Sequence, residues 1–375
     1  MPIGQNPTAR QRYLQAVDLR DRGYNFTQIA SALGYQRSSN ARHAWIQGLR
    51  LLGRESEVPA TRTVRIHNGR TTHTVTAVEL VGLSTNYEYT FGIEIECIGQ
   101  TPAQCARSLT SAGVRCEDAG YTHEVRPQWK AVRDGSLCGG NSAEVVSPVL
   151  RGQEGMNEVR TVMGILRDSG STVNTSCGMH IHIGMDTLTA TEQARVILLH
   201  CKWQSAFDAF ITRQRQANSY AQKRTLAQAS RLANAWAQGL DDTSHGSRRA
   251  ISSNEGRYYT LNLNSFYKYG TFEFRMHGGS LNGINATAWI ALHHGFIAAC
   301  ASDDLPSMLN PDLWADQATM DDLNASMLNA TRTSRSTQKQ ASKVLLQHLY
   351  MRAYITEDVY NHLIARACNL PVQGA

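Results

Sequence analysis

Two histidines alternate with apolar residues in the segment Cys177-Gly178-Met179-His180-Ile181-His182-Ile183-Gly184. Successive side chains of a β-strand point to opposite faces, so His180 and His182 would share one face and the apolar side chains the other. The apolar face predicts packing against a core. The face with the two imidazoles is then either solvated, as for ordinary surface histidines, or part of a binding site.

The same alternation recurs with acidic residues in two other segments. They are Phe91-Gly92-Ile93-Glu94-Ile95-Glu96-Cys97 and Thr271-Phe272-Glu273-Phe274-Arg275-Met276-His277. In an extended strand, Glu94 and Glu96 would share one face of the first segment. Glu273, Arg275 and His277 would share one face of the second. This recurrence favours a binding site over a solvated surface.

Two shorter segments complete the pattern. Glu144-Val145-Val146-Ser147-Pro148 begins with a carboxylate and contains β-branched residues, which strands favour, and Leu261-Asn262-Leu263-Asn264 alternates in the same way. Five such segments predict one sheet whose polar face is a metal and phosphate site. Carboxylate oxygens suit Mg²⁺ or Mn²⁺, and an arginine guanidinium suits phosphate or carboxylate.

The order of these segments resembles the amidoligase family, which belongs to the glutamine-synthetase-like carboxylate–amine ligases. The resemblance covers about residues 85 to 300 and rests on the order of the motifs, with Gly-Met-His-Ile-His and Glu-Phe-Arg as the most specific. The remaining motifs are Gly92-Ile93-Glu94-Ile95-Glu96, Asp134-Gly135-Ser136-Leu137 and Glu144-Val145-Val146-Ser147-Pro148-Val149-Leu150. The resemblance implies an α+β fold with a curved, mainly antiparallel sheet, helices packed on its outer face, and a phage or bacterial source.

The resemblance also implies an ATP-dependent ligase that joins a carboxylate to an amine through an acyl phosphate. ATP would be the co-substrate, and about two Mg²⁺ or Mn²⁺ ions would occupy each site. The implied metal ligands are Glu94, Glu96, Glu144, His180 and Glu273. Of these, Glu94 and Glu273 would also be catalytic, together with Arg275.

Further residues receive roles from the same resemblance. His182, Arg275 and Arg213 are the candidates for binding ATP phosphates or the transferred phosphoryl group. The candidates for substrate contacts are Asp134, Ser136 and Asn264. Asp134 and Arg213 also have simpler explanations. The Asp134-Gly135 pair is typical of a turn, and a cation such as Arg213 stabilises the carboxyl end of a helix.

Three functions are compatible with these residues. The first is the ligase, whose amine and carboxylate substrates would be small molecules, peptides, or modified DNA or protein. The second is a phosphoryl transferase on the same scaffold, similar to a guanidino kinase. The third is a DNA-binding protein with an inactive ligase-like body. The product of turnover separates the first two, because one gives an amide and phosphate and the other a phosphorylated acceptor.

Composition places the chain among soluble globular proteins. It has 375 residues, of which 42% are hydrophobic and 18% charged. A signal peptide and a membrane-spanning run are not apparent, which predicts a cytoplasmic protein without membrane partners. The eight cysteines lack zinc-like spacing and are predicted to be reduced thiols. The wider superfamily includes ring-shaped oligomers, so an oligomer is compatible with the resemblance.

The positive charge is concentrated at the amino terminus. Residues 1–65 contain ten arginines and four acidic residues, which equals the net charge of +6 of the whole chain. Residues 1–55 predict three helices, and the segment Ile29-Ala30-Ser31-Ala32-Leu33-Gly34 resembles the turn of a helix-turn-helix. The start of the third helix would then meet DNA through Arg37, Ser39, Asn40 and Arg42. The alternative is a small three-helix bundle that binds protein or only packs on the ligase domain.

The rest of the chain predicts a linker and hairpin at residues 56–84 and the amidoligase domain at residues 85–375. Asn68-Gly69 favours a tight hairpin turn. Thr189 and Glu192 predict a capping box for a long helix that reaches about Gln216. Residues 239–254 predict a loop over the site, and the chain beyond Thr287 predicts helices.

Overall fold

The computed structural model describes residues 9–22, 24, 26–35, 38–54, 62–68, 71–77, 89–238, 245–305 and 317–369. The chain divides into two compact units, residues 1–80 and residues 81–375. Each unit has its own secondary structure and is described separately below.

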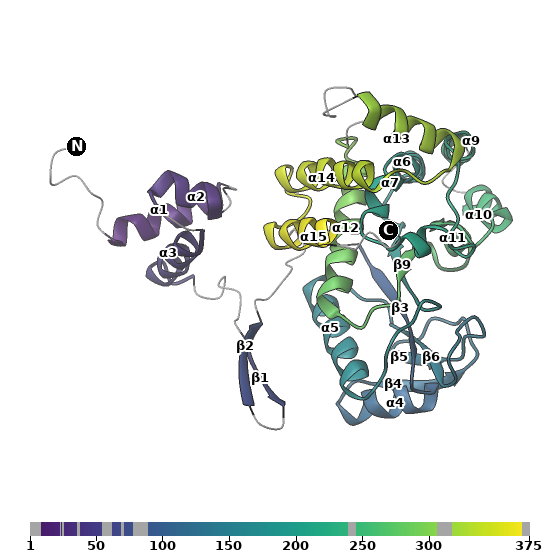
Figure 1. Ribbon diagram of the computed structural model, residues 1–375, viewed down its shortest axis with the longest axis horizontal. Coiled ribbons are helices and arrows are strands. Elements are labelled where there is room, and N and C mark those ends of the chain that lie inside the picture. The colour runs from purple at the N-terminus through teal and green to yellow at the C-terminus, as the bar shows by residue number, and fades with distance from the viewer. Residues whose placement is uncertain are drawn as a thin grey trace. The chain divides into compact units, whose positions relative to one another are not determined.

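The described residues of the first unit form three helices and one antiparallel pair of strands. The helices are α1 (Ala9–Asp21), α2 (Phe26–Leu33) and α3 (Ser38–Leu51), and the strands are β1 (Arg62–Asn68) and β2 (Thr71–Ala77) (Figure 1). Small buried residues such as Ala16, Ala30 and Ala44 let the three helices pack closely around Ile29. Gly34 ends α2 with a left-handed φ of 72°, a conformation that glycine adopts without strain. The two residues predicted to form the hairpin turn include Gly69, which lies outside the described residues.

The second unit is built on a seven-stranded sheet. Its strands are β3 (Phe91–Ile98), β4 (Cys116–Gly120), β5 (Trp129–Val132), β6 (Ser142–Val146), β7 (Gly178–Gly184), β8 (Leu261–Asn262) and β9 (Thr271–Gly278). They lie in the order β4-β5-β6-β3-β7-β9-β8. All neighbours are antiparallel except the parallel pair β4 and β5. The predicted α+β class with a mainly antiparallel sheet is therefore confirmed.

The described part of the second unit also contains helices (Figure 1). They are α4 (Pro102–Ser111), α5 (Gly152–Asp168), α6 (Ala190–Lys202), α7 (Gln204–Asp208), α8 (Arg213–Gln216), α9 (Leu226–Gln238), α10 (His245–Asn254), α11 (Asn264–Tyr269), α12 (Gly283–Ala301), α13 (Gln317–Asn329), α14 (Arg335–Met351) and α15 (Glu357–Asn369). The capping boxes at Thr101 and Thr189 start α4 and α6. Among the described residues, the structure contains no helix long and apolar enough to cross a membrane.

Strand alternation separates the two faces of the sheet. Ile93, Ile95, Ile181 and Phe274 are almost fully buried on the apolar face. Phe274 packs against His293 of α12, with ring centroids 4.1 Å apart. The opposite face carries the acidic and histidine side chains. Packing of the apolar face thus fixes which way these polar side chains point.

The strand register brings polar residues from distant segments side by side. Glu94 is paired with His180 on β7, and Glu96 with Glu144 on β6. One pair further along, His182 lies opposite Glu273 of β9. Directly opposed residues have their Cβ atoms about 4.5–5.5 Å apart, close enough for their side chains to interact.

A β-bulge in β9 changes the face that His277 occupies. The register between β7 and β9 shifts between Met179 and Ile181, and His277 is paired with Met179. The ring of His277 packs on Trp289 of α12, with centroids 5.1 Å apart. The prediction that it shares a face with Arg275 is therefore wrong, because the extra residue of a bulge breaks the period of two.

Three further predictions about secondary structure need correction. The predicted long helix to Gln216 is divided into α6, α7 and α8, and the last of these has its own cap at Thr212. Part of the predicted loop at residues 239–254 is α10, although residues 239–244 lie outside the described residues. The strand with alternating asparagines ends at Asn262, and Asn264 already belongs to α11.

Four histidines are buried against the apolar face of the sheet. His200, His277, His293 and His294 are at most 3% exposed. Burial lowers the pKa of His277, His293 and His294 to about 3 in each case. Neither ring nitrogen of His294 has a hydrogen-bond partner among the described residues. These imidazoles are therefore neutral in the folded protein at any pH where unfolded histidine titrates.

Replacing His294 by Leu should make the protein less sensitive to acid. A buried histidine with a lowered pKa stabilises the fold above the unfolded pKa of about 6.5, and this contribution is lost as the pH falls toward 3. Between pH 7 and pH 5 the His294→Leu protein should lose about 2 kcal/mol less stability than the wild type. Urea unfolding at both pH values measures this difference, and parallel losses in the two proteins would contradict it.

Candidate functional site

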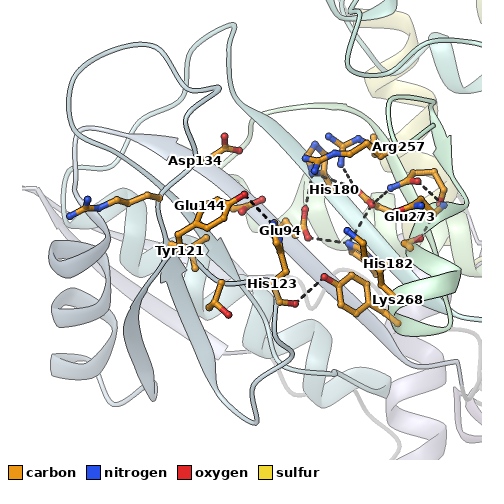
Figure 2. A pocket seen from close by; sticks show the side chains of 18 residues that line it. Glu94, Tyr121, His123, Asp134, Glu144, His180, His182, Arg257, Lys268 and Glu273 are labelled. Atoms are coloured by element: carbon orange, nitrogen blue, oxygen red, sulfur yellow. Dashed lines mark hydrogen bonds and ion pairs between the residues drawn. The ribbon is translucent and has the colours of Figure 1, made fainter. Parts of the chain in front are cut away.

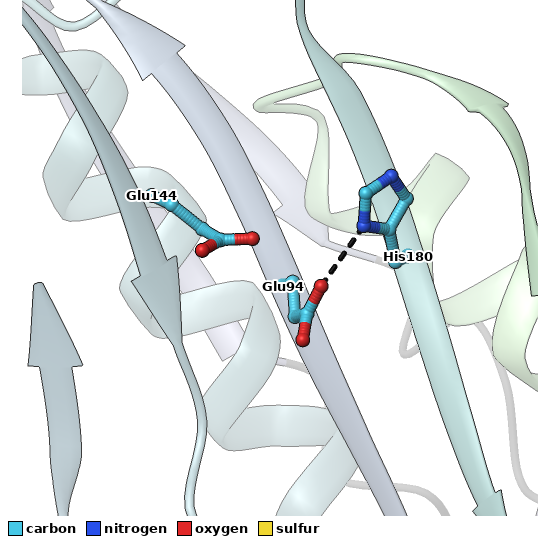
Figure 3. A group of neighbouring side chains, drawn as sticks. All are labelled: Glu94, Glu144 and His180. Carbon is cyan, nitrogen blue, oxygen red and sulfur yellow. Dashed lines mark hydrogen bonds and ion pairs between the residues drawn. The ribbon is translucent and has the colours of Figure 1, made fainter. Parts of the chain in front are cut away.

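Carboxylates and histidines on the polar face form three overlapping groups. In each group the possible ligand atoms lie within 4.8 Å of one another. The groups are Glu94 with Glu144 and His180, Glu94 with His182 and Glu273, and Glu96 with Asp134 and Glu144. Figure 3 shows the first group, whose members come from the adjacent strands β6, β3 and β7.

Glu94 lies at the centre of this arrangement (Figure 2). Its Oε2 atom lies 2.9 Å from His180 Nδ1, and its Oε1 atom lies 3.1 Å from His182 Nε2. One carboxylate therefore accepts hydrogen bonds from two imidazoles of the same strand. Thr271 Oγ1, 3.0 Å from His182 Nδ1, holds the other side of that ring.

Glu273 is held by neighbours on its own strand and on β8. Asn262 donates a hydrogen bond of 2.6 Å to Glu273 Oε2. Arg275 forms an ion pair with Glu273 Oε1. His180 Nδ1 and His182 Nε2 lie 3.7 and 3.9 Å from the two carboxylate oxygens. The Glu273 carboxylate therefore faces both histidines while Arg275 compensates part of its charge.

Glu96 occupies the other end of the polar face. Its carboxylate accepts a hydrogen bond from the backbone N–H of Gly178, and its Oε1 atom lies 3.8 Å from His180 Nε2. A Cβ atom on Gly178 would lie only 2.5 Å from Arg215 Nη2 and 2.9 Å from His180 Nε2. Glycine is therefore required at this position for the three polar side chains to come together.

The crowding of these charges changes their proton affinities. Burial and the nearby carboxylates of Glu94 and Glu96 raise the pKa of Glu144 well above its usual value. Burial opposes ionisation of Glu94 as well, but His182 and His180 outweigh it and hold the Glu94 pKa well below its usual value. For His182, burial is outweighed by Glu273 and Glu94, which raise its pKa. The face thus contains more carboxylates than its own cations neutralise.

The donor set fits divalent cations. Carboxylate oxygens with one or two imidazole nitrogens are ligands that Mg²⁺ and Mn²⁺ accept. A cation between Glu94 and Glu144 would relieve the repulsion that raises the Glu144 pKa. His180 Nδ1 faces Glu94 and Glu273, at 2.9 and 3.7 Å, and Nε2 faces Glu96 at 3.8 Å, so each ring nitrogen lies beside carboxylates that could share a cation with it.

Two chambers meet at this cluster. The first, which we call the arginine chamber, has a volume of about 1000 Å³ and is lined by Glu96, Asp134, Ser136, Arg215, Arg257 and Arg275, among others. The second chamber has a volume of about 360 Å³ and is lined by Phe91, Lys130, Pro148, Val149, Asp186 and Arg249, among others. His180 borders the arginine chamber and His182 the second chamber, so the cluster can contact ligands on both sides.

A family model described as "putative amidoligase enzyme" matches residues 87–297, which is more than half of the chain. The chain belongs to the amidoligase family. The match begins just before β3 and ends within α12, so it includes every strand of the sheet and all members of the three groups. No curated protein matches the chain. Membership of this family indicates an enzyme of the ligase type, and it makes an inactive DNA-binding body the less favoured explanation.

Two predicted substrate residues of the amidoligase domain lie at the arginine chamber. Asp134 Oδ1 accepts a hydrogen bond of 2.7 Å from the backbone N–H of Ser136, so the predicted Asp-Gly turn is present. The Asp134 side chain also belongs to the group with Glu96 and Glu144. Ser136 is exposed and lines the chamber.

Asn264 has a different environment from the one its strand pattern indicates. Its amide nitrogen lies 3.2 Å from the carbonyl oxygen of Ser252 and 3.4 Å from that of Ser253, so it donates to α10. Asn262 instead makes the contact with Glu273. The prediction assigned this role to the wrong asparagine, because the strand ends before residue 264.

Arg213 is not part of the cluster. Its guanidinium donates a hydrogen bond of 2.7 Å to the carbonyl oxygen of Thr333 and one of 3.3 Å to Gln216. Residues two positions apart lie on nearly opposite sides of a helix, so Arg215 of the same short helix points into the arginine chamber instead. The prediction of a phosphate-binding role for Arg213 is therefore corrected, because Arg215 and not Arg213 lines the site.

Sequence reasoning missed three other residues at the two chambers. Arg257 and Asn262 border the acidic cluster, and Lys130 lines the second chamber. Lys130 is buried and donates hydrogen bonds of 3.1 and 2.7 Å to the carbonyl oxygens of Thr122 and Glu124. Lys130 lies on the polar face because it alternates with Trp129 and Ala131. In a strand of only four residues this alternation is too short to be recognised from the sequence.

The predicted nucleic-acid contacts lie in the first unit. Arg37 is outside the described residues. Ser39, Asn40 and Arg42 belong to α3, and of their side chains only that of Asn40 is described, as exposed. These contacts remain predictions.

Proposed function

We propose that the chain is an ATP- and Mg²⁺-dependent ligase that joins a carboxylate to an amine through an acyl phosphate. The observation that carries this proposal is the Glu94 carboxylate between two histidines, with Glu144 and Glu273 on either side, in a member of the amidoligase family. A mainly antiparallel sheet with its polar face exposed to two chambers is compatible with a glutamine-synthetase-like fold, which forms part of the proposal.

The metal-binding residues of this proposal are those of the three groups. One Mg²⁺ ion would be held by Glu94 and His180, with Glu273, 3.7 Å from His180, as an additional ligand. A second would be held by Glu96 and Glu144, with Asp134 as an additional ligand. Bound Mg²⁺ would offset the charge of the nucleotide phosphates during phosphoryl transfer.

The protein's own residues would bind and orient the reacting groups. A carboxylate oxygen of the acid substrate attacks the γ-phosphorus of ATP, the bond to the bridging oxygen breaks, and ADP leaves. Arg275 lies beside Glu273 at the metal-binding cluster and would stabilise the charge of the transferred phosphoryl group. His182, whose raised pKa favours the cationic form, would bind a phosphate oxygen.

The second step forms the amide. The amine nitrogen attacks the carbonyl carbon of the acyl phosphate, the C–O bond to phosphate breaks, and the nitrogen loses a proton. Water must stay away from the acyl phosphate, and the polar face favours this because Tyr269 and the loop with His123 cover it, joined by a hydrogen bond of 2.9 Å. Family membership favours this ligase over a phosphoryl transferase of the same scaffold.

Replacing Glu94 by Gln should abolish ligation while leaving the fold intact. The amide cannot accept two hydrogen bonds from histidines or bind a cation as a carboxylate does, so we expect a loss of at least about 100-fold in phosphate release from Mg-ATP. Pools of amino acids, polyamines and peptides would be tested, with mass spectrometry of each acceptor. The expected product is lighter by one water than its two reactants.

Glu154→Gln is the matched control, because Glu154 is an exposed glutamate on α5 that lines neither chamber. This control should retain wild-type turnover. Equal activity in Glu94→Gln and wild type would refute the proposed role of the cluster. A phosphorylated acceptor without amide would instead identify a phosphoryl transferase.

We further propose that the first unit binds double-stranded DNA. Two observations favour this: the unit packs its three helices around its own core, and it holds the whole net charge of the chain. Asp18 and Asp21 are already paired with Arg22 and Arg54, so they do not neutralise the other arginines of residues 1–54. Ser39, Asn40 and Arg42 of α3, together with Arg37, would contact the DNA.

DNA binding by the full chain should weaken as salt increases. Replacing both Arg37 and Arg42 by Gln should reduce the slope of log affinity against log salt by about 2, the loss of two phosphate contacts. Arg22→Gln is the control, because Arg22 is paired with Asp18, and it should leave the slope nearly unchanged. Fluorescence anisotropy with a labelled duplex, repeated at several salt concentrations, measures the slope for each protein. An unaltered slope in the double variant, or no binding by the wild type, would refute this proposal.

A further inference from the structure

Arg215 is a buried cation at the wall of the arginine chamber. The residue is 8% exposed, and its side chain extends from α8 over Gly178 of β7. Its Nη2 atom donates a hydrogen bond of 3.2 Å to the backbone carbonyl oxygen of Arg275. This contact positions the guanidinium beside the carboxylate of Glu96 and the ring of His180.

The charge of Arg215 is not matched by an ion pair. Among the described residues, no carboxylate lies within ion-pair distance of it, and its Nε atom has no hydrogen-bond partner. Burial lowers the pKa of Arg215, and the more distant Glu96 offsets part of that effect. Guanidinium groups remain charged in proteins, so a buried one without an anionic partner is costly. The arrangement is therefore complete only when an anion binds.

A second arginine of the chamber is also unmatched. Arg257 is exposed and lies over the ring of Tyr258, 5.3 Å from its centroid, without an ion pair in the described part of the chain. Arg275, in contrast, is engaged by Glu273. The chamber therefore presents two guanidinium groups beyond the one that faces the reacting groups.

The two chambers differ in charge. The arginine chamber is lined by three arginines and by the acids Glu96 and Asp134. The second chamber is lined by four acids, two strongly basic residues and two histidines, namely Glu94, Glu124, Glu144, Asp186, Lys130, Arg249, His123 and His182. An anionic substrate is favoured in the first and disfavoured in the second.

We propose that Arg215 binds a second carboxylate of the acid substrate, so that the ligase acts on di- or polycarboxylic acids that occupy the arginine chamber. This inference rests on the ligase function proposed above. The carboxylate that reacts would lie at the cluster near Arg275, and the second one would pair with the fork of Arg215, with Arg257 nearer the chamber mouth. A chamber of about 1000 Å³ leaves room for an acid as large as a short peptide.

A carboxylate fits this position better than a nucleotide phosphate. The planar guanidinium of Arg215 matches the two oxygens of a carboxylate. The proposed function already places the nucleotide phosphates at Arg275 and His182, which leaves Arg215 for the acid substrate. The same anionic chemistry could come from ATP, so the test measures the two ligands separately.

Calorimetric titration of the full chain with glutarate and with acetate, at equal ionic strength and without ATP, tests the proposal. Glutarate should bind the wild type at least about tenfold more tightly than acetate, because only it can contact both positions. Arg215→Gln should remove this advantage. Arg213→Gln is the matched control, because the Arg213 guanidinium is engaged by Thr333. This variant should still bind glutarate more tightly than acetate.

Three results would overturn the proposal. These are equal affinities of glutarate and acetate for the wild type, an undiminished glutarate affinity in Arg215→Gln, or weaker Mg-ADP binding by Arg215→Gln with glutarate binding unchanged. Arg215→Lys keeps the positive charge and serves as a second variant in case Arg215→Gln does not fold. It should bind glutarate with an affinity between those of the wild type and Arg215→Gln. Failure of the ligase function would appear differently, as absence of amide product with glutarate binding intact.

Discussion

The site depends on one physical constraint: four glutamates must share a single face of a sheet. Glu94, Glu96, Glu144 and Glu273 are brought together by strand register, and their mutual repulsion is only partly compensated by His180, His182 and Arg275. The folded chain stores this repulsion because packing of the opposite face fixes the side-chain directions. In the proposed function bound cations would relieve this repulsion, and the face would then accept the phosphates of a nucleotide.

The remainder of the amidoligase domain serves to hold this face and give access to it. Helices such as α5 and α12 cover the apolar side, where Trp289 and Phe296 exclude water. The bulge in β9 turns His277 into that core while Arg275 stays beside Glu273. Access comes from two chambers of different charge. A ligase needs such an arrangement, because an acid, a nucleotide and an amine must meet at one point.

Much of the polar face could be predicted from the sequence because the period of two is strict in regular strands. The alternation in residues 91–97 and 178–184 correctly placed Glu94 with Glu96 on one face of their strand and His180 with His182 on one face of theirs, and the register brings both pairs to the same face of the sheet. The same argument failed for His277, since a bulge is a local event that the pattern does not reveal. It also failed for Asn264, where a strand gives way to a helix after two residues.

Arg215 illustrates the limit more clearly. The long helix predicted through this region is interrupted, so its phase at residues 213–216 depends on tertiary packing. Arg213 and Arg215 have the same chemistry and nearly the same position in the chain. Only the folded structure shows that one is engaged by Thr333 and the other faces the chamber.

The most direct test of this account is the location of manganese in crystals grown with Mn²⁺ and a non-hydrolysable ATP analogue. Anomalous scattering identifies the ion independently of the protein atoms. The account predicts manganese within reach of Glu94 and His180, and a second ion within reach of Glu96 and Glu144. Manganese bound elsewhere, with the acidic face empty and the nucleotide analogue distant from it, would contradict the account.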